Sequence, residues 1–206
     1  MMYKHFLIAA MAVLFFACGQ APEQRGERED QVQMEAREGD MLTQGGLTPE
    51  ERAFLDNLAS LCGQSFAGEE VYLAEGRESW ADDPFVMHVT KCEEDVVHIP
   101  FHVGDDTSRT WMFLVEDDGR LRFRHDHRYP DGTPEEKTMY GGYADGTGTA
   151  YAQHFPKDDY SRELLEDYFG REWRVVMDEE MTTYSYRLLY DGEVVFQADF
   201  DLTNPL

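Results

Sequence analysis

The sequence predicts a mainly β protein, an antiparallel meander of about nine strands that is closed or nearly closed into a barrel. Two observations support this fold class. Short segments rich in aromatic and β-branched residues, most with alternating apolar and polar positions, recur between Glu70 and Leu202. Turn residues separate nearly all of these segments, and little helical sequence lies between them. Successive hairpins of this kind form barrels or sandwiches.

The expected strands follow one another at short, regular spacing. They are Glu70–Ala74, Phe85–Cys92, Val96–Val103, Thr110–Glu116, Leu121–His127, Thr147–Phe155, Trp173–Met177, Thr183–Tyr190 and Val194–Leu202. In the central hairpin, the segment Glu116–Gly119 suits a type I turn with its glycine as the left-handed bulge residue. This turn pairs Val115 with Leu121 and Trp111 with His125.

The strands before this hairpin can be placed by matching their apolar faces. An odd-length loop between the second and third strands pairs Met87 with Phe101. A longer connection to the next strand then sets Val103 opposite Trp111. Four consecutive strands therefore share one apolar surface.

Two segments have helical periodicity. Thr48 is an N-cap followed by Pro49 and a capping-box glutamate, and the helix is expected to stop at Gly63. A short amphipathic helix is expected within Tyr160–Phe169, as a lid or plug of the β body.

The glycines of Tyr140–Tyr143 are expected to permit a tight passage of the backbone, because no helix follows them to make a phosphate site.

Composition limits the possible partners. The 206 residues include 42 acidic and 18 basic side chains, which gives a formal net charge of -24. Nucleic acid and anionic lipid surfaces are also negatively charged, so they are poor partners for the folded body. The aromatic content of 13% is too high for a disordered acidic chain. We expect one folded domain over residues 47–206, a monomer, with no cofactor.

The N-terminal residues are typical of an exported protein. A lysine precedes an apolar run of about twelve residues, which is too short for a membrane-spanning helix and suits a signal peptide. The run ends in Phe-Phe-Ala-Cys-Gly, which resembles a bacterial lipobox, although Phe15 replaces the usual leucine. The resemblance implies cleavage after residues 1–17 and lipidation of Cys18. Residues 18–46 have the composition of an acidic, disordered tether. The alternatives are an ordinary signal peptide or an uncleaved anchor.

Two further cysteines remain once Cys18 is assigned to lipid. Cys62 and Cys92 form an even pair in a compartment expected to be oxidising, so we predict a disulfide bond. The alternative is two buried free thiols.

Four residues are expected to gather at one end of the apolar surface: Arg109, Trp111, His125 and His127. A cation at the mouth of an aromatic pocket would pair with the head group of an anionic amphiphile, while the pocket holds its tail. Two histidines on one strand face could instead bind a metal ion, with Asp105 as a third ligand, or act in acid–base catalysis.

Structural roles for the same residues are open alternatives. The two histidines could satisfy hydrogen bonds at a barrel rim. Asp105 is expected opposite Arg109, so the arginine could pair with Asp105 or Asp106 across the loop. Three other histidines are expected on the solvated outer face: His88, His98 and His102.

Several segments of the folded part resemble a family of uncharacterised bacterial secreted proteins and lipoproteins. They are LASLCGQSFAG, IPFHVGDDTSRTW, RHDHRYPDGT, MYGG and FDLTNPL. More distantly, the expected architecture is similar to lipocalin-like and fatty-acid-binding-like barrels, an analogy that implies little about function.

The expected function is that of a bacterial cell-envelope lipoprotein, anchored through its lipid and facing the periplasm or the exterior. Its barrel is expected to bind an apolar or amphiphilic small molecule. Two other classes remain: an envelope protein-interaction module with a filled core, and a hydrolase or metalloenzyme that uses Arg109, His125 and His127.

Overall fold

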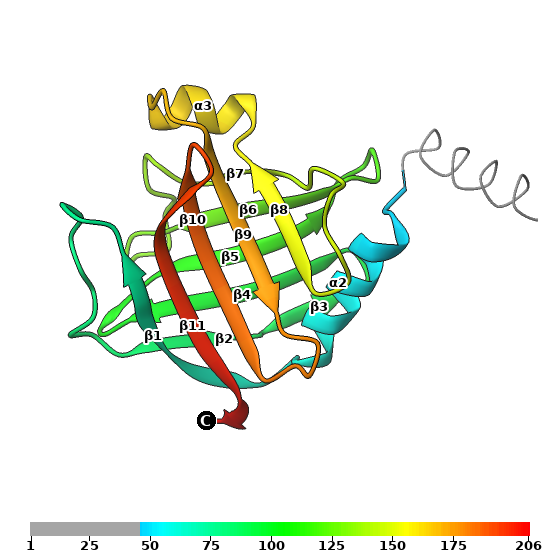
Figure 1. Cartoon of the computed structure of the whole chain (residues 1–206), viewed down its shortest axis with the longest axis horizontal. Helices are drawn as coiled ribbons and strands as arrows, with labels where there is room; N and C mark the ends of the chain where they lie inside the picture. Colours follow the sequence, from blue (N-terminus) through cyan, green and yellow to red (C-terminus); the bar gives the residue numbers. More distant parts are fainter. Residues whose placement is uncertain (1–45) are drawn as a thin grey trace, which may run out of the picture. The chain divides into compact units, whose positions relative to one another are not determined.

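Eleven strands form one antiparallel sheet, which curls into a nearly closed barrel (Figure 1). The structure is a computed structural model that describes residues 46–206. The predicted mainly β fold with two helices is confirmed in this part of the chain. The expected signal peptide (1–17), Cys18 and all of the expected tether (18–46) except its last residue lie outside the described residues.

The strands are β1 (Ser65–Leu73), β2 (Phe85–His88), β3 (Lys91–Glu93), β4 (Val96–Val103), β5 (Asp106–Val115), β6 (Leu121–His127), β7 (Tyr140–Tyr143), β8 (Ala152–Pro156), β9 (Arg171–Met177), β10 (Thr183–Tyr190) and β11 (Glu193–Pro205). The path around the sheet is β7-β6-β5-β4-β2-β1-β11-β10-β9-β8, and β3 pairs with β4. Two differences raise the strand count above the expected nine. The segment Phe85–Cys92 is interrupted between β2 and β3, and β7 was not expected to be a strand.

The barrel closes at the glycine pair of β7. Gly142 forms a single bridge with Lys157, just after β8. A Cβ atom on Gly142 would lie 1.8 Å from the Pro156 carbonyl oxygen, and one on Gly141 would lie 1.9 Å from the Phe123 carbonyl oxygen. The predicted tight passage of the backbone is therefore confirmed.

The pairing of the central hairpin agrees with the sequence prediction. Val115 lies opposite Leu121, and Trp111 lies opposite His125. The predicted pairing of Met87 with Phe101 is also confirmed. The β5–β6 hairpin therefore has the register that its turn residues predict.

The predicted pairing of Val103 with Trp111 is wrong, because Trp111 lies opposite Ile99. The reason is a tighter connection than expected: Gly104 adopts a φ of 56°, and Val103 pairs with Asp106, so β5 starts earlier. The partner of Trp111 moves by four positions, an even number, so the side chains keep their faces.

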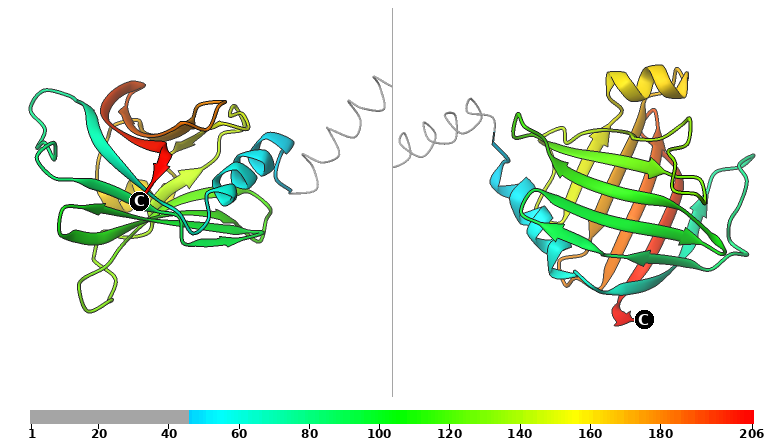
Figure 2. Two further views of the ribbon diagram at one scale, coloured as in Figure 1. Left: turned by 90° about the horizontal axis from the view of Figure 1, so that it is seen from below. Right: turned by 180° about the vertical axis from the view of Figure 1, so that it is seen from behind.

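The helix α2 (Pro49–Ser60) covers the end of the barrel away from the β1–β2 loop (Figure 2). Its start has the predicted capping box, in which Thr48 and Glu51 accept hydrogen bonds from each other's backbone N–H. Phe54 is fully buried, and its ring centroid lies 5.7 Å from that of Phe113. The predicted disulfide between Cys62 and Cys92 is confirmed and ties the end of this helix to β3.

The helix α3 (Asp159–Leu165) lies beside β7 and is shorter than expected (Figure 1). It ends where Glu166 adopts a left-handed φ of 52°. Tyr168 is fully exposed and Phe169 is half-exposed, so these two residues, expected on the apolar face of the helix, do not plug the barrel. Neither α2 nor α3, the two helices of residues 46–206, is long and apolar enough to cross a membrane.

Gly142→Ala should prevent normal closure of the barrel. The added methyl group would overlap a carbonyl oxygen of the adjoining segment, so the free energy of unfolding should fall by about 2 kcal/mol or more. Gly46→Ala is the matched control, because a Cβ there meets nothing within 4 Å. Urea denaturation of both variants measures the difference, and equal stability would contradict the steric role of Gly142.

Candidate functional site

The interior of the barrel has a filled half and an open half. Phenylalanine rings occupy the half next to α2: Phe113 and Phe123 have centroids 4.8 Å apart, and Phe123 and Phe155 have centroids 5.2 Å apart. All three are 0% exposed. At the other end, where β5 starts and β6 ends, lies a cavity of about 290 Å³.

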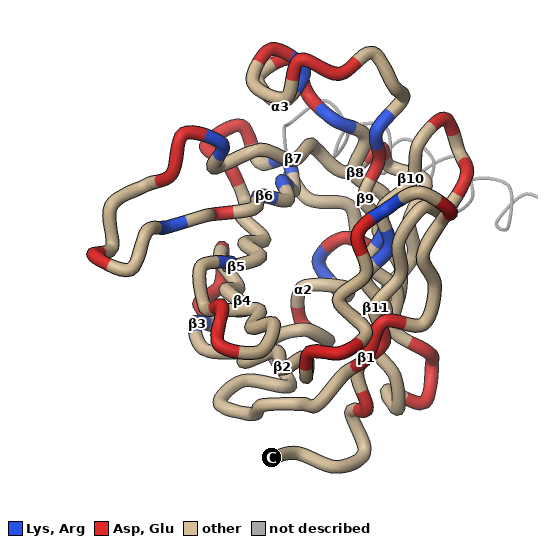
Figure 3. The backbone as a smooth tube through the Cα atoms, turned by 90° about the vertical axis from the view of Figure 1, so that its left-hand side faces the viewer, with Lys and Arg blue, Asp and Glu red and all other residues tan. Residues whose placement is uncertain are grey.

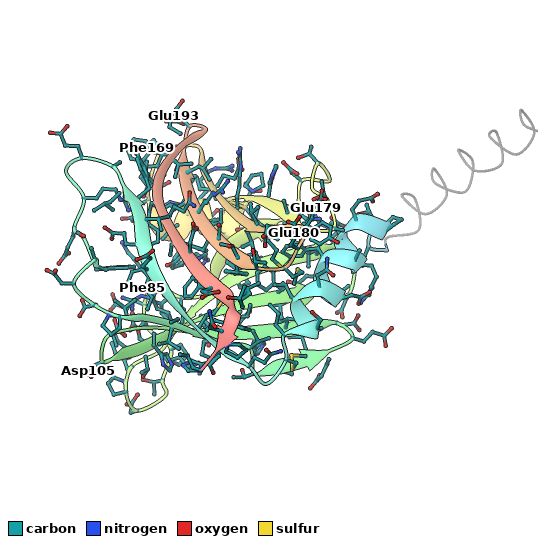
Figure 4. The ribbon with its side chains drawn as sticks, turned by 60° about the horizontal axis from the view of Figure 1, so that its bottom comes forward. Phe85, Asp105, Phe169, Glu179, Glu180 and Glu193 are labelled. Carbon is teal, nitrogen blue, oxygen red and sulfur yellow. A yellow bond between two sulfur atoms is a disulfide. The ribbon has the colours of Figure 1, made fainter. Side chains whose placement is uncertain are left out.

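All four residues predicted from the sequence line this cavity: Arg109, Trp111, His125 and His127. Trp111 and His125 are a cross-strand pair, as are Arg109 and His127, so the register of one hairpin brings the four together. Asp105, the considered third metal ligand, is exposed at the tip of the β4–β5 turn and is not among the lining residues (Figure 4).

The cavity wall is aromatic and preformed. The Trp111 ring stacks on Phe101 at 4.6 Å and 14°, and on Tyr186 at 4.6 Å and 16°. Trp111 is only 1% exposed, so its neighbours fix its orientation. Trp80 and Trp173 also line the cavity, which places all three tryptophans of the chain there. Such a wall can hold an apolar ligand without first reorganising.

Both ring nitrogens of His125 are already engaged. Nδ1 lies 3.3 Å from the Tyr140 carbonyl oxygen, which can only accept, so Nδ1 carries the proton. Nε2 therefore accepts a hydrogen bond from the Tyr186 hydroxyl at 2.9 Å. Burial, with a smaller contribution from His127, lowers the pKa of His125 well below its usual value of 6.5. This histidine is neutral and held in place.

His127 lies nearer the mouth of the cavity. The Tyr140 hydroxyl and His127 Nε2 are 2.9 Å apart, and Nδ1 lies 4.0 Å from a Glu135 carboxylate oxygen. Burial raises the pKa of Tyr140 to about 12, so its hydroxyl keeps its proton. Burial, followed by the charge of Arg109, lowers the pKa of His127. The two histidines are thus parts of a hydrogen-bonded rim, the structural alternative considered above.

Three arginines surround the mouth of the cavity. Arg109 lies 2.7 Å from Asp106, which confirms the pairing considered from the sequence, and its guanidinium lies 4.9 Å from the Trp80 ring. Asp105 does not lie opposite Arg109, because Arg109 pairs across the strands with Phe101 and His127.

Sequence reasoning missed the other two arginines. Arg171 starts β9, pairs with Asp167 and lies 4.9 Å from the Tyr190 ring. Side chains two residues apart on a strand share a face, so Arg171 lies on the same face of β9 as the buried Trp173, and this spacing in the sequence could have revealed it. Arg77 lies in the β1–β2 loop, 5.3 Å from the same Tyr190 ring, and loop residues carry no periodic signal.

The cavity lining does not share the acidic charge of the whole protein. Its charged side chains are three arginines and one glutamate, Glu78, whereas the chain has a formal net charge of -24. Figure 3 looks onto this end of the barrel and shows acidic stretches on several surrounding loops. Asp106 and Asp167 pair with two of these arginines, so the mouth is close to neutral and repels an anion less than the rest of the acidic body.

The remaining histidine prediction concerns the outer face. His88, His98 and His102 lie there and are partly exposed, as predicted. His88 Nε2 and His102 Nδ1 are 3.1 Å apart, and His88 Nδ1 lies 2.6 Å from the Ser65 hydroxyl.

Among residues 46–206, no three histidine, cysteine or carboxylate side chains gather closely enough to hold a metal ion.

The buried, neutral His125 should make the protein less stable in mild acid. Below about pH 6.5 the unfolded chain takes up a proton that the folded site resists, because the folded pKa lies lower. The free energy of unfolding should therefore fall as pH decreases from 6.5 toward the folded pKa, by up to about 1.4 kcal/mol per pH unit for this group.

Denaturation at several pH values and NMR titration of the His125 ring measure this effect. The His125→Gln variant should reduce the slope of stability against pH below 6.5. A His125 signal that titrates at or above pH 6.5 in the folded protein would contradict the assignment.

Comparison with known proteins adds no relative to this geometry, since the chain matches no family model and no curated protein.

Proposed function

We propose that the folded domain binds a small anionic amphiphile in the cavity between β5, β6 and β9. One observation carries this proposal: an aromatic cavity in a strongly acidic chain has three arginines at its mouth. Apolar walls favour the tail of such a ligand, and guanidinium groups favour its carboxylate or phosphate head.

The arginines are placed to bind an anion from outside. The side chains of Arg109 and Arg171 are 21% and 17% exposed, so both are largely buried but still reach solvent. Each already has an aspartate partner, Asp106 or Asp167. In the described part of the chain, Arg77 forms no ion pair and is the cation most available to a ligand. Partial burial strengthens these charge interactions relative to bulk water.

The state of His125 favours binding over acid–base chemistry at this residue. A general base needs a free ring nitrogen within reach of its substrate. His125 uses one nitrogen for a backbone carbonyl and the other for Tyr186. His127 has Nε2 next to the Tyr140 hydroxyl. We therefore assign these side chains to the cavity wall, where they hold Tyr140 and Tyr186 in position.

The proposal includes an anchor in the bacterial cell envelope. The lipobox-like segment before Cys18 supports lipidation of this cysteine, which would attach the protein to a membrane without a spanning helix. The disulfide between Cys62 and Cys92 supports an oxidising location, facing the periplasm or the exterior. The acidic body would be repelled by an anionic lipid surface, so a tether between the two would be useful.

The proposal predicts that Arg109→Gln weakens binding of anionic amphiphiles. Loss of one charged hydrogen bond should reduce affinity about tenfold, or ~1.4 kcal/mol. Arg120→Gln is the matched control, since Arg120 also pairs with an aspartate in a hairpin turn and stacks on an aromatic ring, but outside the cavity.

Binding is measured on the mature, disulfide-bonded protein labelled with ¹⁵N, through the indole N–H signals of its three tryptophans. The probes are cinnamate, octanoate and palmitate, and cinnamyl alcohol serves as the neutral comparison. Saturable shifts with the carboxylates, weakened by Arg109→Gln and unchanged by Arg120→Gln, support the proposal. If no carboxylate shifts the indole signals, or if both variants bind equally well, the proposal is wrong.

A further inference from the structure

We propose that the ligand of this cavity is a compact, planar carboxylate, such as an aromatic acid, and not a long-chain fatty acid. This inference rests on the proposed function and narrows it to one class of ligand. It depends on the volume of the cavity, on the filled floor beneath it and on the orientation of its aromatic rings.

The volume of the cavity limits the size of the ligand. Small-molecule sites in proteins usually measure about 300–1,000 Å³, so a cavity of about 290 Å³ lies at the small end of that range. A site of this size suits an aromatic acid with one or two rings. A long-chain fatty acid would need a larger site.

The floor of the cavity prevents a longer tail from entering the barrel. The ring of Phe123 lies 4.6 Å from that of His125, directly below the cavity lining. Phe113 and Phe155 pack against Phe123, and Phe54 of α2 packs against Phe113. All four phenylalanines are 0% exposed, so the tail would have to displace a close-packed cluster.

The aromatic rings of the cavity lining are stacked on one another. Phe101, Trp111 and Tyr186 form one stack, with interplanar angles of 14° and 16°. His125 and Tyr140 form another, at 4.7 Å and 16°. A planar ligand that extends the second stack at Tyr140, a lining residue of intermediate burial, would be stabilised beyond the burial of its area, whereas an alkyl chain gains only the burial.

The arginines fix the direction of the ligand. Arg77 and Arg109 come from the β1–β2 loop and from the start of β5, and Arg171 comes from the start of β9, all at the mouth. The phenylalanine cluster lies at the opposite side of the cavity lining. A carboxylate would therefore remain at the mouth, and its ring would lie against the stacked aromatic wall.

The test compares carboxylates of equal charge and different shape. Cinnamate and octanoate have similar size, but only cinnamate is planar, and palmitate adds length. Binding is measured on the intact disulfide-bonded protein by calorimetry and by the three indole N–H signals. We expect cinnamate to bind about tenfold more tightly than octanoate or palmitate, and to shift all three indole signals.

A second variant tests the size limit without removing a charge. Leu188 lines the cavity and is 8% exposed, so Leu188→Phe should narrow the space. The affinity of this variant for 2-naphthoate should fall several-fold more than its affinity for the smaller benzoate. An equal loss for both acids would contradict the volume argument.

The outcomes separate this inference from the proposed function. If palmitate or octanoate binds as tightly as cinnamate, the compact planar ligand is wrong and the anionic amphiphile remains. If cinnamyl alcohol binds as tightly as cinnamate, the site does not require an anion, and the proposed function and this inference both fail. If none of the probes shifts the indole signals, the proposed function itself fails, and this inference fails with it.

Discussion

The pairing of Trp111 with His125 is the constraint on which the rest of the site depends. It sets the phase of two strands, so that both side chains point inward together with Arg109 and His127. A slip of one residue would turn all of these side chains outward. Tyr186, from the far wall, then contacts both members of the pair, stacking on one ring and donating a hydrogen bond to the other. A single cross-strand register thus joins the two walls of the barrel.

Much of this arrangement could be predicted from the sequence, because turn chemistry acts locally. The β5–β6 turn fixes its hairpin, and the lining residues on these two strands follow from it. The residues of the β4–β5 connection predict its turn less clearly. The register predicted there was wrong by four positions, although the side chains keep their predicted faces of the sheet. The prediction of a strand depends on alternating apolar and polar side chains, and the two central residues of β7 are glycines, so this strand was not predicted. Arg77 comes to the cavity from a loop, and only the three-dimensional path of that loop reveals it.

The contrast between an acidic body and a nearly neutral mouth that contains three arginines bears on selectivity. An anion that approaches most of the surface is repelled, and this repulsion disfavours large polyanions more than small ones. Near the mouth, Arg109 and Arg171 retain aspartate partners, so each stays compensated when no ligand is bound. An incoming carboxylate need not create a charged site. It adds to one that is already balanced and partly dehydrated, which suits reversible binding.

The position of the barrel's seam has a consequence for how the chain acquires its structure. Inside the sheet a long ladder joins β1 to β11, the first and last strands, whereas at the seam β7 and the end of β8, neighbours in sequence, meet at one bridge. Contacts between such distant segments form slowly, since a long loop must first be ordered. While β11 is still being synthesised, β1 lacks one of its two neighbours and the ring stays open. The first strand of the barrel therefore gains its second neighbour only when the last strand of the chain is available.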